Sequence, residues 1–219
     1  MSLKQENVSE ASPSGSTDES ENHANLPETF SIRSSTNPDI SNLTVESYDT
    51  PADKAGFHQF QWVKDHISSS DRLARSSAPN YNKKDSDQKL CDESIKFLQD
   101  NKIEHVISLN SEAENDTIKN KLKDKGIKYT PLPVEDYTAP TLDQLKKGWD
   151  EYKKHRGGTL VWCGFGWGRT GTMVSALQIY TEQDQDHPER LSDTDYKKNH
   201  VESTEQCEML NKLQKDLDK

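Results

Sequence analysis

The stretch LVWCGFGWGRTGTMVSALQIY, residues 160–180, decides how this chain folds. In it Cys163 is followed by three glycines in alternate positions, then by Arg169 and a pattern typical of a buried helix. Glycine costs stability in regular structure and is used where a backbone turns sharply or approaches another group closely. We therefore interpret residues 163–168 as a loop that joins a short buried strand to a helix, and as a binding site.

The segments around this loop predict alternating strands and helices. We expect helices at residues 92–102, 113–126, 141–158 and 170–182, strands at residues 103–110, 127–134 and 159–162, and a short helix at residues 51–68. In the 51–68 helix, Phe60 and Trp62 are expected to cover a core. The alternation predicts an α/β fold, a single domain with a central, largely parallel sheet flanked by helices. Binding sites of such sheets lie at the carboxyl ends of the strands, which is where Cys163 would lie.

Composition divides the 219 residues into one folded domain and a polar extension. Residues 1–51 are rich in Ser, Asn, Glu and Thr without a sustained hydrophobic period, which predicts a disordered acidic tail. We expect the folded domain to span residues 52–219. Most of the net charge of −10 falls on the first 70 residues, which hold four basic and eleven acidic side chains. Neither part has the basic stripe of a nucleic-acid binder.

The cysteines and the hydropathy pattern bear on the cellular compartment. Cys91, Cys163 and Cys207 are widely spaced and show no zinc-binding pattern, which favours a reduced, cytoplasmic setting and no metal. We expect Cys91 and Cys207 to be small core residues, with a redox partner for Cys163 as the alternative. No stretch predicts a membrane segment. Secretion stays open if the opening Met-Ser-Leu replaced native residues.

The chemistry of the loop predicts a phosphate site. The backbone N–H groups of five residues can all point inward and form a nest for an anion: Gly164, Phe165, Gly166, Trp167 and Gly168. The helix N-terminus behind the loop adds unpaired N–H groups and a positive dipole end. Arg169 can complete the ring with a bidentate guanidinium. This field favours the thiolate of Cys163, a nucleophile aimed at phosphorus, and the Thr170 hydroxyl can assist the departure of the sulfur.

The run CGFGWGRTGTM, with its Cys-x5-Arg-Thr spacing, resembles the signature of cysteine-dependent protein tyrosine phosphatases. It is most similar to the small atypical dual-specificity and archaeal-type tyrosine phosphatases. The resemblance covers residues 72–216 and implies a monomeric enzyme that hydrolyses phosphotyrosine in a protein substrate through a phosphocysteine on Cys163. Whether phosphoserine and phosphothreonine are also substrates stays open. The resemblance implies no metal and no organic cofactor.

The resemblance extends to three further segments. The family's general acid lies on a loop some 25 to 30 residues before the cysteine, and YTPLPVEDYTAPTLDQL places Asp136 there, with Glu135 as a distant second. The segment RLARSSAPNY is similar to the family's R-S-x-x-P segment, and HVESTEQCEMLNKL to its closing I-E-T-x-E-Q helix. Gln206 corresponds to the glutamine of that helix, which helps to place the hydrolytic water.

The sequence departs from the family in two places. Trp162 stands where the family has a histidine, and YKKNH lacks the usual arginine before the closing helix. Two alternative functions remain open: a catalytically silent phosphate-binding module, and a phosphoinositide or RNA 5′-phosphatase on the same fold. The retention of Cys163, Arg169, Asp136 and Thr170 favours an enzyme. The uncharged residues 164–168 favour a simple phosphate monoester as the substrate.

Overall fold

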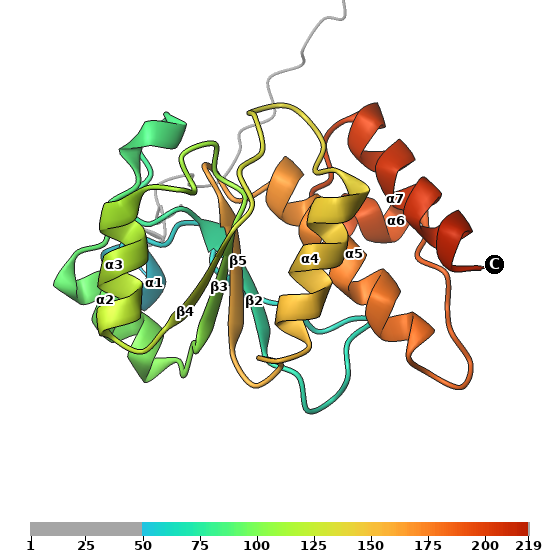
Figure 1. Ribbon diagram of the computed structural model, residues 1–219, viewed down its shortest axis with the longest axis horizontal. Helices are drawn as coiled ribbons and strands as arrows, with labels where there is room; N and C mark the ends of the chain where they lie inside the picture. The colour runs from blue at the N-terminus through green and yellow to red at the C-terminus, as the bar shows by residue number, and fades with distance from the viewer. Residues whose placement is uncertain (1–49, 219) are drawn as a thin grey trace, which may run out of the picture. The chain divides into compact units, whose positions relative to one another are not determined.

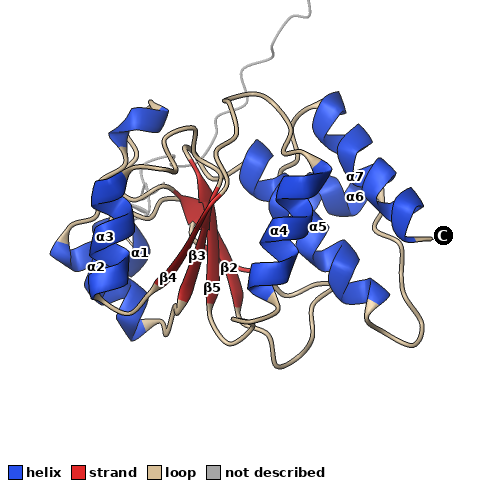
Figure 2. Ribbon diagram, in the orientation of Figure 1, coloured by secondary structure: helices blue, strands red, loops and turns tan. Residues whose placement is uncertain are grey.

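The computed structural model describes residues 50–218, which form a sheet between two layers of helices (Figure 1). In sheet order the strands are β1 (Gln61–Trp62), β2 (Leu73–Ser77), β5 (Thr159–Cys163), β3 (His105–Ser108) and β4 (Lys128–Pro131). The helices are α1 (Pro51–Lys54), the 3-10 helix η1 (Asp85–Asp87), α2 (Asp92–Asp100), α3 (Asp116–Asp124), α4 (Leu142–Tyr152), α5 (Gly168–Gln183), α6 (Asp193–Lys198) and α7 (Thr204–Leu217). Helices α1–α3 cover one face of the sheet and α4–α7 the other (Figure 2).

The sheet is parallel except at one edge, which confirms the predicted α/β fold. Strand β5 lies at the centre, parallel to both β2 and β3, and β3 is parallel to β4; only the two-residue β1 is antiparallel to its neighbour. The register pairs Ser77 at the end of β2 with Cys163 at the end of β5. The carboxyl ends of these parallel strands therefore lie side by side at the same end of the sheet, and Cys163 lies there, as the sequence predicts.

Both faces of the sheet are buried, and β5 shows how its sequence serves both. Val161 and Cys163 belong to the hydrophobic cluster that also holds residues of α4, α5 and α7. Leu160 and Trp162 belong to the cluster that holds residues of α1, α2 and α3. Alternate side chains of a strand point to opposite faces, so a strand covered on both sides is apolar throughout.

Helix α5 is buried almost along its whole length because α4, α6 and α7 all pack against it. Its close packing depends on small residues. A Cβ atom at Gly171 would lie 2.2 Å from the Asn199 carbonyl oxygen, just after α6. The helix that begins at the loop is thus held in place on several sides, which fixes the position of its N-terminus.

The prediction of a helix at residues 51–68 is wrong beyond its first turn. Helix α1 ends at Lys54, and Gly56 follows with a φ of +84° and the Asn80 side chain where a Cβ would lie. The chain then runs into β1, in which Trp62 is packed against the core beside Phe60, as expected for both. The sequence also did not identify β2, and Cys91 is partly exposed at the start of α2 and not in the core.

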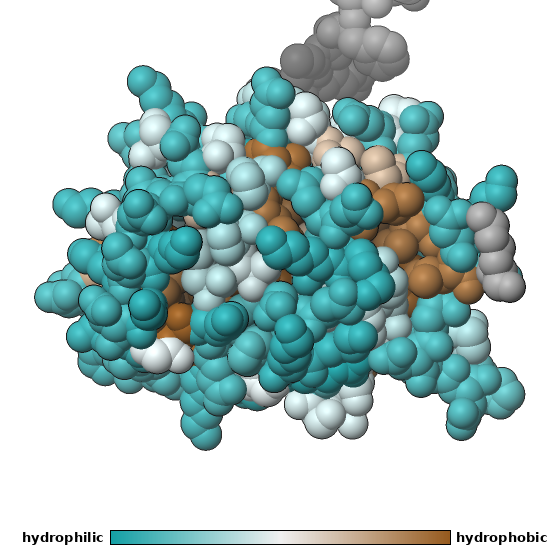
Figure 3. Space-filling model, viewed as in Figure 1, coloured by the Kyte–Doolittle hydropathy of each residue, from teal (hydrophilic) through white to brown (hydrophobic). Residues whose placement is uncertain are grey.

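The predicted tail, residues 1–51, lies outside the described residues except for its last two. The Thr50 side chain caps the N-terminus of α1, and Pro51 is the first residue of that helix. The surface of the described domain is mostly hydrophilic, with apolar side chains visible in patches, notably near α7 (Figure 3). Within residues 50–218, the helices are all too short or too polar to cross a membrane.

Candidate active site

The loop 163–168 joins the end of β5 to the start of α5, as the sequence predicts. Cys163 is 3% exposed, and the Gly166 N–H donates to its Sγ at 3.3 Å. Gly166 has a φ of +99°, which strains any residue with a side chain, and its N–H faces the sulfur in this conformation. The sulfur thus lies within the loop beside the Gly166 N–H, close to the N-terminus of α5.

Each glycine of the loop has a close neighbour from another part of the chain. A Cβ at Gly164 would lie 2.2 Å from Asp85 Oδ1, one at Gly166 would lie 2.6 Å from the Ser76 carbonyl carbon, and one at Gly168 would lie 2.5 Å from Glu202 Oε2. The neighbour of Gly166 is backbone and cannot move aside, whereas the other two are side-chain ends. The glycine pattern therefore reports contacts to β2, η1 and the segment before α7.

Arg169 is buried and held by two carboxylates. It is 4% exposed, and its Nη1 and Nη2 donate to Asp85 Oδ2 at 2.5 Å and Oδ1 at 2.9 Å. Nη1 also donates to the Val134 carbonyl at 3.0 Å, and Nη2 pairs with Asp136 Oδ1 at 2.7 Å. Burial opposes the charge, but Asp85, Cys163 and Asp136 together raise the pKa of Arg169 above its ordinary value. The guanidinium is charged and fixed at every accessible pH.

The loop after β4 brings Asp136 to the same place. The Asp136 side chain is half exposed, and its Oδ1 accepts from the Tyr137 N–H at 3.1 Å as well as from Arg169. Tyr137 has a φ of +64°, so the backbone turns sharply immediately after the acid. Glu135 is exposed and its carbonyl accepts from Thr138. The geometry thus places Asp136, and not Glu135, beside the guanidinium.

Thr170 is fully buried, and its Oγ1 has no hydrogen-bond partner within the described part of the chain. A buried hydroxyl without a partner costs stability. Among the described residues, the first turn of α5 therefore holds one hydroxyl without a hydrogen-bond partner, directly after Arg169.

Cys163, Arg169 and Asp136 line one cavity of about 200 Å³. Its lining is Tyr81, Asp136, Tyr137, Cys163, Phe165, Trp167, Gly168, Arg169, Glu202 and Gln206. Burial and the negative charges of Asp136, Asp85 and Cys163 raise the pKa of Tyr81, so its hydroxyl is neutral. Gln206, which the sequence proposes for placing water, donates to the Thr138 carbonyl at 3.1 Å.

Sequence reasoning missed four residues of this site: Tyr81, Asp85, Tyr137 and Glu202. Tyr81, Tyr137 and Glu202 stand within segments already compared with the family, but nothing in their spacing indicates a pocket wall. Asp85 lies in the polar run NKKDSDQ, where a single carboxylate has no distinguishing pattern. Only the fold brings η1 to the start of α5.

Trp162, which stands where the family has a histidine, does not line the cavity. It is fully buried on the opposite face of the sheet from Cys163, with its Nε1 donating to Ser108 Oγ at 2.8 Å. Its ring packs near Phe57 and Tyr129. Trp162 therefore fixes the position of β5 but does not contact the substrate cavity. Groups of three or more residues able to hold a metal ion do not occur within residues 50–218.

A parallel sheet with a Cys-x5-Arg loop at its carboxyl edge defines the class of cysteine-dependent phosphatases. The sequence profile of the family described as "PTP-SAK: Swiss Army Knife protein, DSP-PTPase phosphatase domain" matches residues 83–216. The chain belongs to this family, and residues 83–216 form its phosphatase domain of the dual-specificity type.

Individual relatives agree with the family. The chain is 38% identical over 90 residues to the tyrosine-protein phosphatase CDC14 of Saccharomyces cerevisiae, a match that covers 40% of this chain and 16% of CDC14. Two solved structures show the same fold. They are the kinase associated phosphatase KAP with its catalytic cysteine replaced by serine (TM-score 0.59, 15% identity, 74% of this chain, 96% of that chain), and PTPMT1 in complex with PI(5)P (TM-score 0.51, 21% identity, 72% and 96%).

Proposed function

We propose that this protein hydrolyses phosphotyrosine in protein substrates through a phosphocysteine on Cys163. The observation that carries the proposal is the convergence of Cys163, Arg169 and Asp136 on one cavity, from three separate elements. A sulfur nucleophile, an oxyanion donor and a carboxylic acid are the three groups that two-step phosphoryl transfer without a metal requires.

In the first step the Cys163 thiolate attacks phosphorus, and an S–P bond forms as the bond to the tyrosine oxygen breaks. Arg169 has one guanidinium edge, Nη1 and Nη2, occupied by Asp85, so its Nε and the second Nη2 hydrogen remain for two phosphate oxygens. Binding would displace Asp136 from Nη2. The freed carboxyl group, protonated, then donates its proton to the leaving oxygen.

In the second step water attacks phosphorus and the S–P bond breaks. Asp136, now a carboxylate, takes a proton from that water. Gln206 lines the same cavity and can orient the water, and the unpaired Thr170 hydroxyl can donate to the sulfur as it leaves. The nucleophile and the group that transfers protons in this cycle are the Cys163 and Asp136 side chains, and water is the second reactant.

The walls of the cavity favour an aromatic phosphate monoester. Tyr81, Tyr137, Phe165 and Trp167 surround its mouth, and Tyr137 and Phe165 are the large side chains that stand out into solvent. Aromatic walls suit the ring of phosphotyrosine. Besides Arg169 the charged lining groups are Asp136 and Glu202, both acidic. A polyphosphorylated ligand such as a phosphoinositide would meet repulsion there, because the described residues that line this cavity include no lysine.

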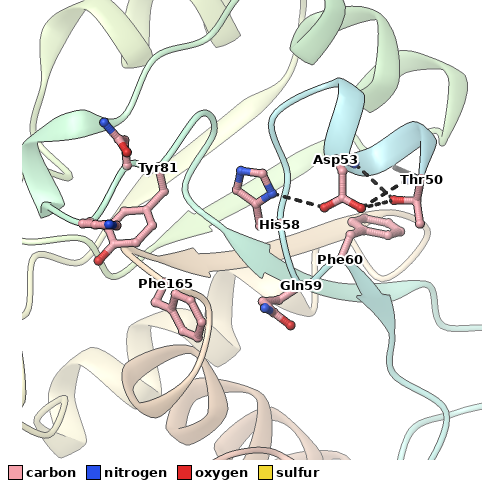
Figure 4. A pocket seen from close by; sticks show the side chains of 9 residues that line it. Thr50, Asp53, His58, Gln59, Phe60, Tyr81 and Phe165 are labelled. Carbon is pink, nitrogen blue, oxygen red and sulfur yellow. Dashed lines mark hydrogen bonds and ion pairs between the residues drawn. The ribbon is translucent and has the colours of Figure 1, made fainter. Parts of the chain in front are cut away.

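A wide groove next to the cavity supports a protein substrate. It has a volume of about 770 Å³ and shares Tyr81 and Phe165 with the catalytic cavity. Figure 4 shows these two rings on one side of the groove, Thr50 and Phe60 on the other, and His58 and Gln59 between them. Residues that flank a phosphotyrosine could lie there, whereas a small phosphate ester would leave the groove empty.

The test is turnover of a phosphotyrosine peptide, a phosphoserine peptide, PI(5)P and a 5′-phosphorylated RNA by the purified protein in metal-free buffer. We expect turnover of the phosphotyrosine peptide, its loss in Cys163→Ser, and full activity in the matched control Cys207→Ser, whose cysteine lies in α7 outside the cavity. Binding of the peptide without turnover by the wild type would favour the silent binding module. Preferred turnover of PI(5)P or of the RNA would overturn the choice of substrate but not the mechanism.

A further inference from the structure

Arg75 is a buried guanidinium directly behind the phosphate-binding loop, and none of the steps above uses it. It lies in the middle of β2 and is 3% exposed. Its Nη1 donates to the Asn199 carbonyl at 2.5 Å and its Nη2 to the Gly166 carbonyl at 2.6 Å. Both acceptors are neutral backbone oxygens, and among the described residues no carboxylate forms an ion pair with it.

Burying a charge without an ion-pair partner costs stability, so other groups must offset the charge of Arg75. Burial lowers the pKa of Arg75 to about 10, and the negative charges of Cys163 and Glu202 act in the opposite direction. The guanidinium is therefore protonated at neutral pH. The nearest anions that offset its charge belong to the catalytic cavity.

The hydrogen bond to Gly166 also fixes a peptide plane of the loop. In a trans peptide the C=O and the following N–H point in opposite directions. Because the Gly166 carbonyl points to Arg75, the Trp167 N–H points away from Arg75. The β2 backbone at Ser76 lies 2.6 Å from the position of a Cβ on Gly166, so the loop packs directly against β2 at this residue.

We propose that Arg75 is a positioning residue of the phosphatase reaction: it turns the Trp167 N–H toward the bound phosphate and places a positive charge behind Cys163. The proposal rests on the function proposed above. It has two separable parts, the orientation of the loop and the positive charge. The orientation needs a forked guanidinium that donates to two carbonyls, whereas any cation at this position, such as lysine, supplies the charge.

The groups that set the field at Cys163 come from every element around it. They are Arg75 in β2, Tyr81 after β2, Asp85 in η1, Asp136 after β4, Arg169 in α5, Glu202 before α7, and His200 after α6, whose pKa burial and Arg75 lower. Arg75 and Arg169 are the two cations of this set. Removal of Arg75 therefore leaves one cation against three carboxylates, which disfavours both the thiolate and a bound oxyanion.

The experiment compares Arg75→Met and Arg75→Lys with the wild type and with Arg72→Met. Arg72 is a matched control, because it is an arginine directly before the same strand and also donates to a backbone carbonyl (Asn101, 2.9 Å). It is exposed and lies at the amino end of β2, whereas the phosphate-binding loop lies at the carboxyl end. Two readouts need no turnover: calorimetric affinity for tungstate, and the pH profile of Cys163 alkylation by iodoacetamide, followed by mass spectrometry of the Cys163 peptide.

We expect Arg75→Met to weaken tungstate binding by at least about tenfold and to move the alkylation profile to higher pH. Arg75→Lys, which keeps the charge, should restore the alkylation profile but not the tungstate affinity. Arg72→Met should match the wild type in both. Thermal unfolding shows whether each variant folds. If Arg75→Met does not fold, the comparison of Arg75→Lys with the wild type is the test.

The inference is overturned if a folded Arg75 variant binds tungstate as tightly as the Arg72→Met control. The proposed function fails separately, and visibly, if the wild type binds tungstate but does not turn over a phosphotyrosine peptide. In that outcome Arg75 would still be a positioning residue of an anion site.

Discussion

Asp85 and Arg169 form a two-point ion pair inside the candidate active site, with 2.5 and 2.9 Å between their donor and acceptor atoms. Asp85 is further fixed by the Ser111 N–H, which donates to its Oδ2 at 3.0 Å, and by Asn110 Nδ2, which donates to its carbonyl. This pair leaves one edge of the guanidinium for phosphate. The rotamer of Arg169 is therefore set before any substrate arrives, which reduces the entropy lost on binding.

Asp85→Asn should lower phosphate affinity while the fold persists. The amide keeps the shape but loses the charge and one acceptor oxygen, so we expect KM for a phosphotyrosine peptide to rise about tenfold, the effect of losing one charge-assisted hydrogen bond. Steady-state kinetics measure it. Asp87→Asn, in the same 3-10 helix, is the control and should leave KM unchanged, because the Asp87 side chain accepts from the Lys84 N–H and is not among the described residues that line the cavity.

The same pair should persist in the mildly acidic buffers used for such enzymes. Burial raises the pKa of Asp85, but the hydrogen bonds from Arg169 and Ser111 outweigh it and hold the pKa below the ordinary value. A depressed carboxyl pKa contributes stability above the unfolded value of about 3.9 and loses it as the pH falls through the folded value. An Asp85→Asn protein whose stability still fell as steeply as the wild type below pH 4 would show that other carboxyls dominate.

Asp136→Asn should slow turnover according to the leaving group. A general acid contributes about 10²-fold to 10⁴-fold, and most where the departing oxygen is strongly basic. We expect a small loss with para-nitrophenyl phosphate and a large one with a phosphotyrosine peptide, measured as kcat. The matched variant is Glu135→Gln, at the exposed neighbour. Equal losses for both variants would remove Asp136 from its role.

Gly166→Ala should damage both stability and activity. Its φ of +99° and the backbone of Ser76 at 2.6 Å leave no room for a Cβ, and a left-handed non-glycine residue costs about 1–3 kcal/mol. Urea unfolding measures the loss. Gly157→Ala, at an exposed position with nothing within 4 Å of the added Cβ, should have little effect. A wild-type-like Gly166→Ala would show that the loop adopts another backbone conformation.

Thr170→Val should separate stability from catalysis. Valine has nearly the shape of threonine, and the Thr170 hydroxyl is buried without a partner, so its removal should leave the free energy of unfolding unchanged or raise it. If the hydroxyl assists the departing sulfur, the phosphocysteine should accumulate. A pre-steady-state burst in the variant, larger than in the wild type, would show this. Loss of stability with unchanged kinetics would make Thr170 a purely structural residue.

His105 should make stability depend on pH in a defined window. It is fully buried between the hydroxyls of Thr159 (3.1 Å) and Thr130 (2.8 Å), and burial, with a smaller effect of His155, lowers its pKa to about 3. The unfolded histidine titrates near 6.5. The stability that comes from keeping His105 neutral in the folded protein is therefore complete above about pH 6.5 and is lost as the pH falls toward 3.

His105→Gln should flatten this dependence by up to about 1.4 kcal/mol per pH unit between pH 6.5 and 3. Denaturant unfolding at a series of pH values measures the slope. His187→Gln, in the exposed turn after α5, is the control and should keep the slope of the wild type. Equal slopes for the wild type and His105→Gln would mean that His105 is protonated in the folded protein.

The alternation of strands and helices was predictable because each element carries its own signal. Thr141 caps α4 with its side chain, Gly126 ends the α3 segment at a φ of +73°, and β5 is apolar on both faces. The helix predicted at residues 51–68 failed because Gly56 and the contact with Asn80 redirect the chain, and a two-residue edge strand carries almost no pattern. Strand β2 contains Arg75, Ser76 and Ser77, and polar residues of this kind conceal a buried strand.

From local spacing alone, the sequence by itself determined the loop with Cys163 and Arg169, and its resemblance to a known family placed Asp136. Only the tertiary structure decided that Asp85 holds Arg169 and that Arg75 lies behind Gly166. These contacts join residues 84 and 91 positions apart in the chain. The energy between two charges depends on their separation in space, and a local sequence pattern does not show which distant side chain will lie beside a given charge in the folded protein.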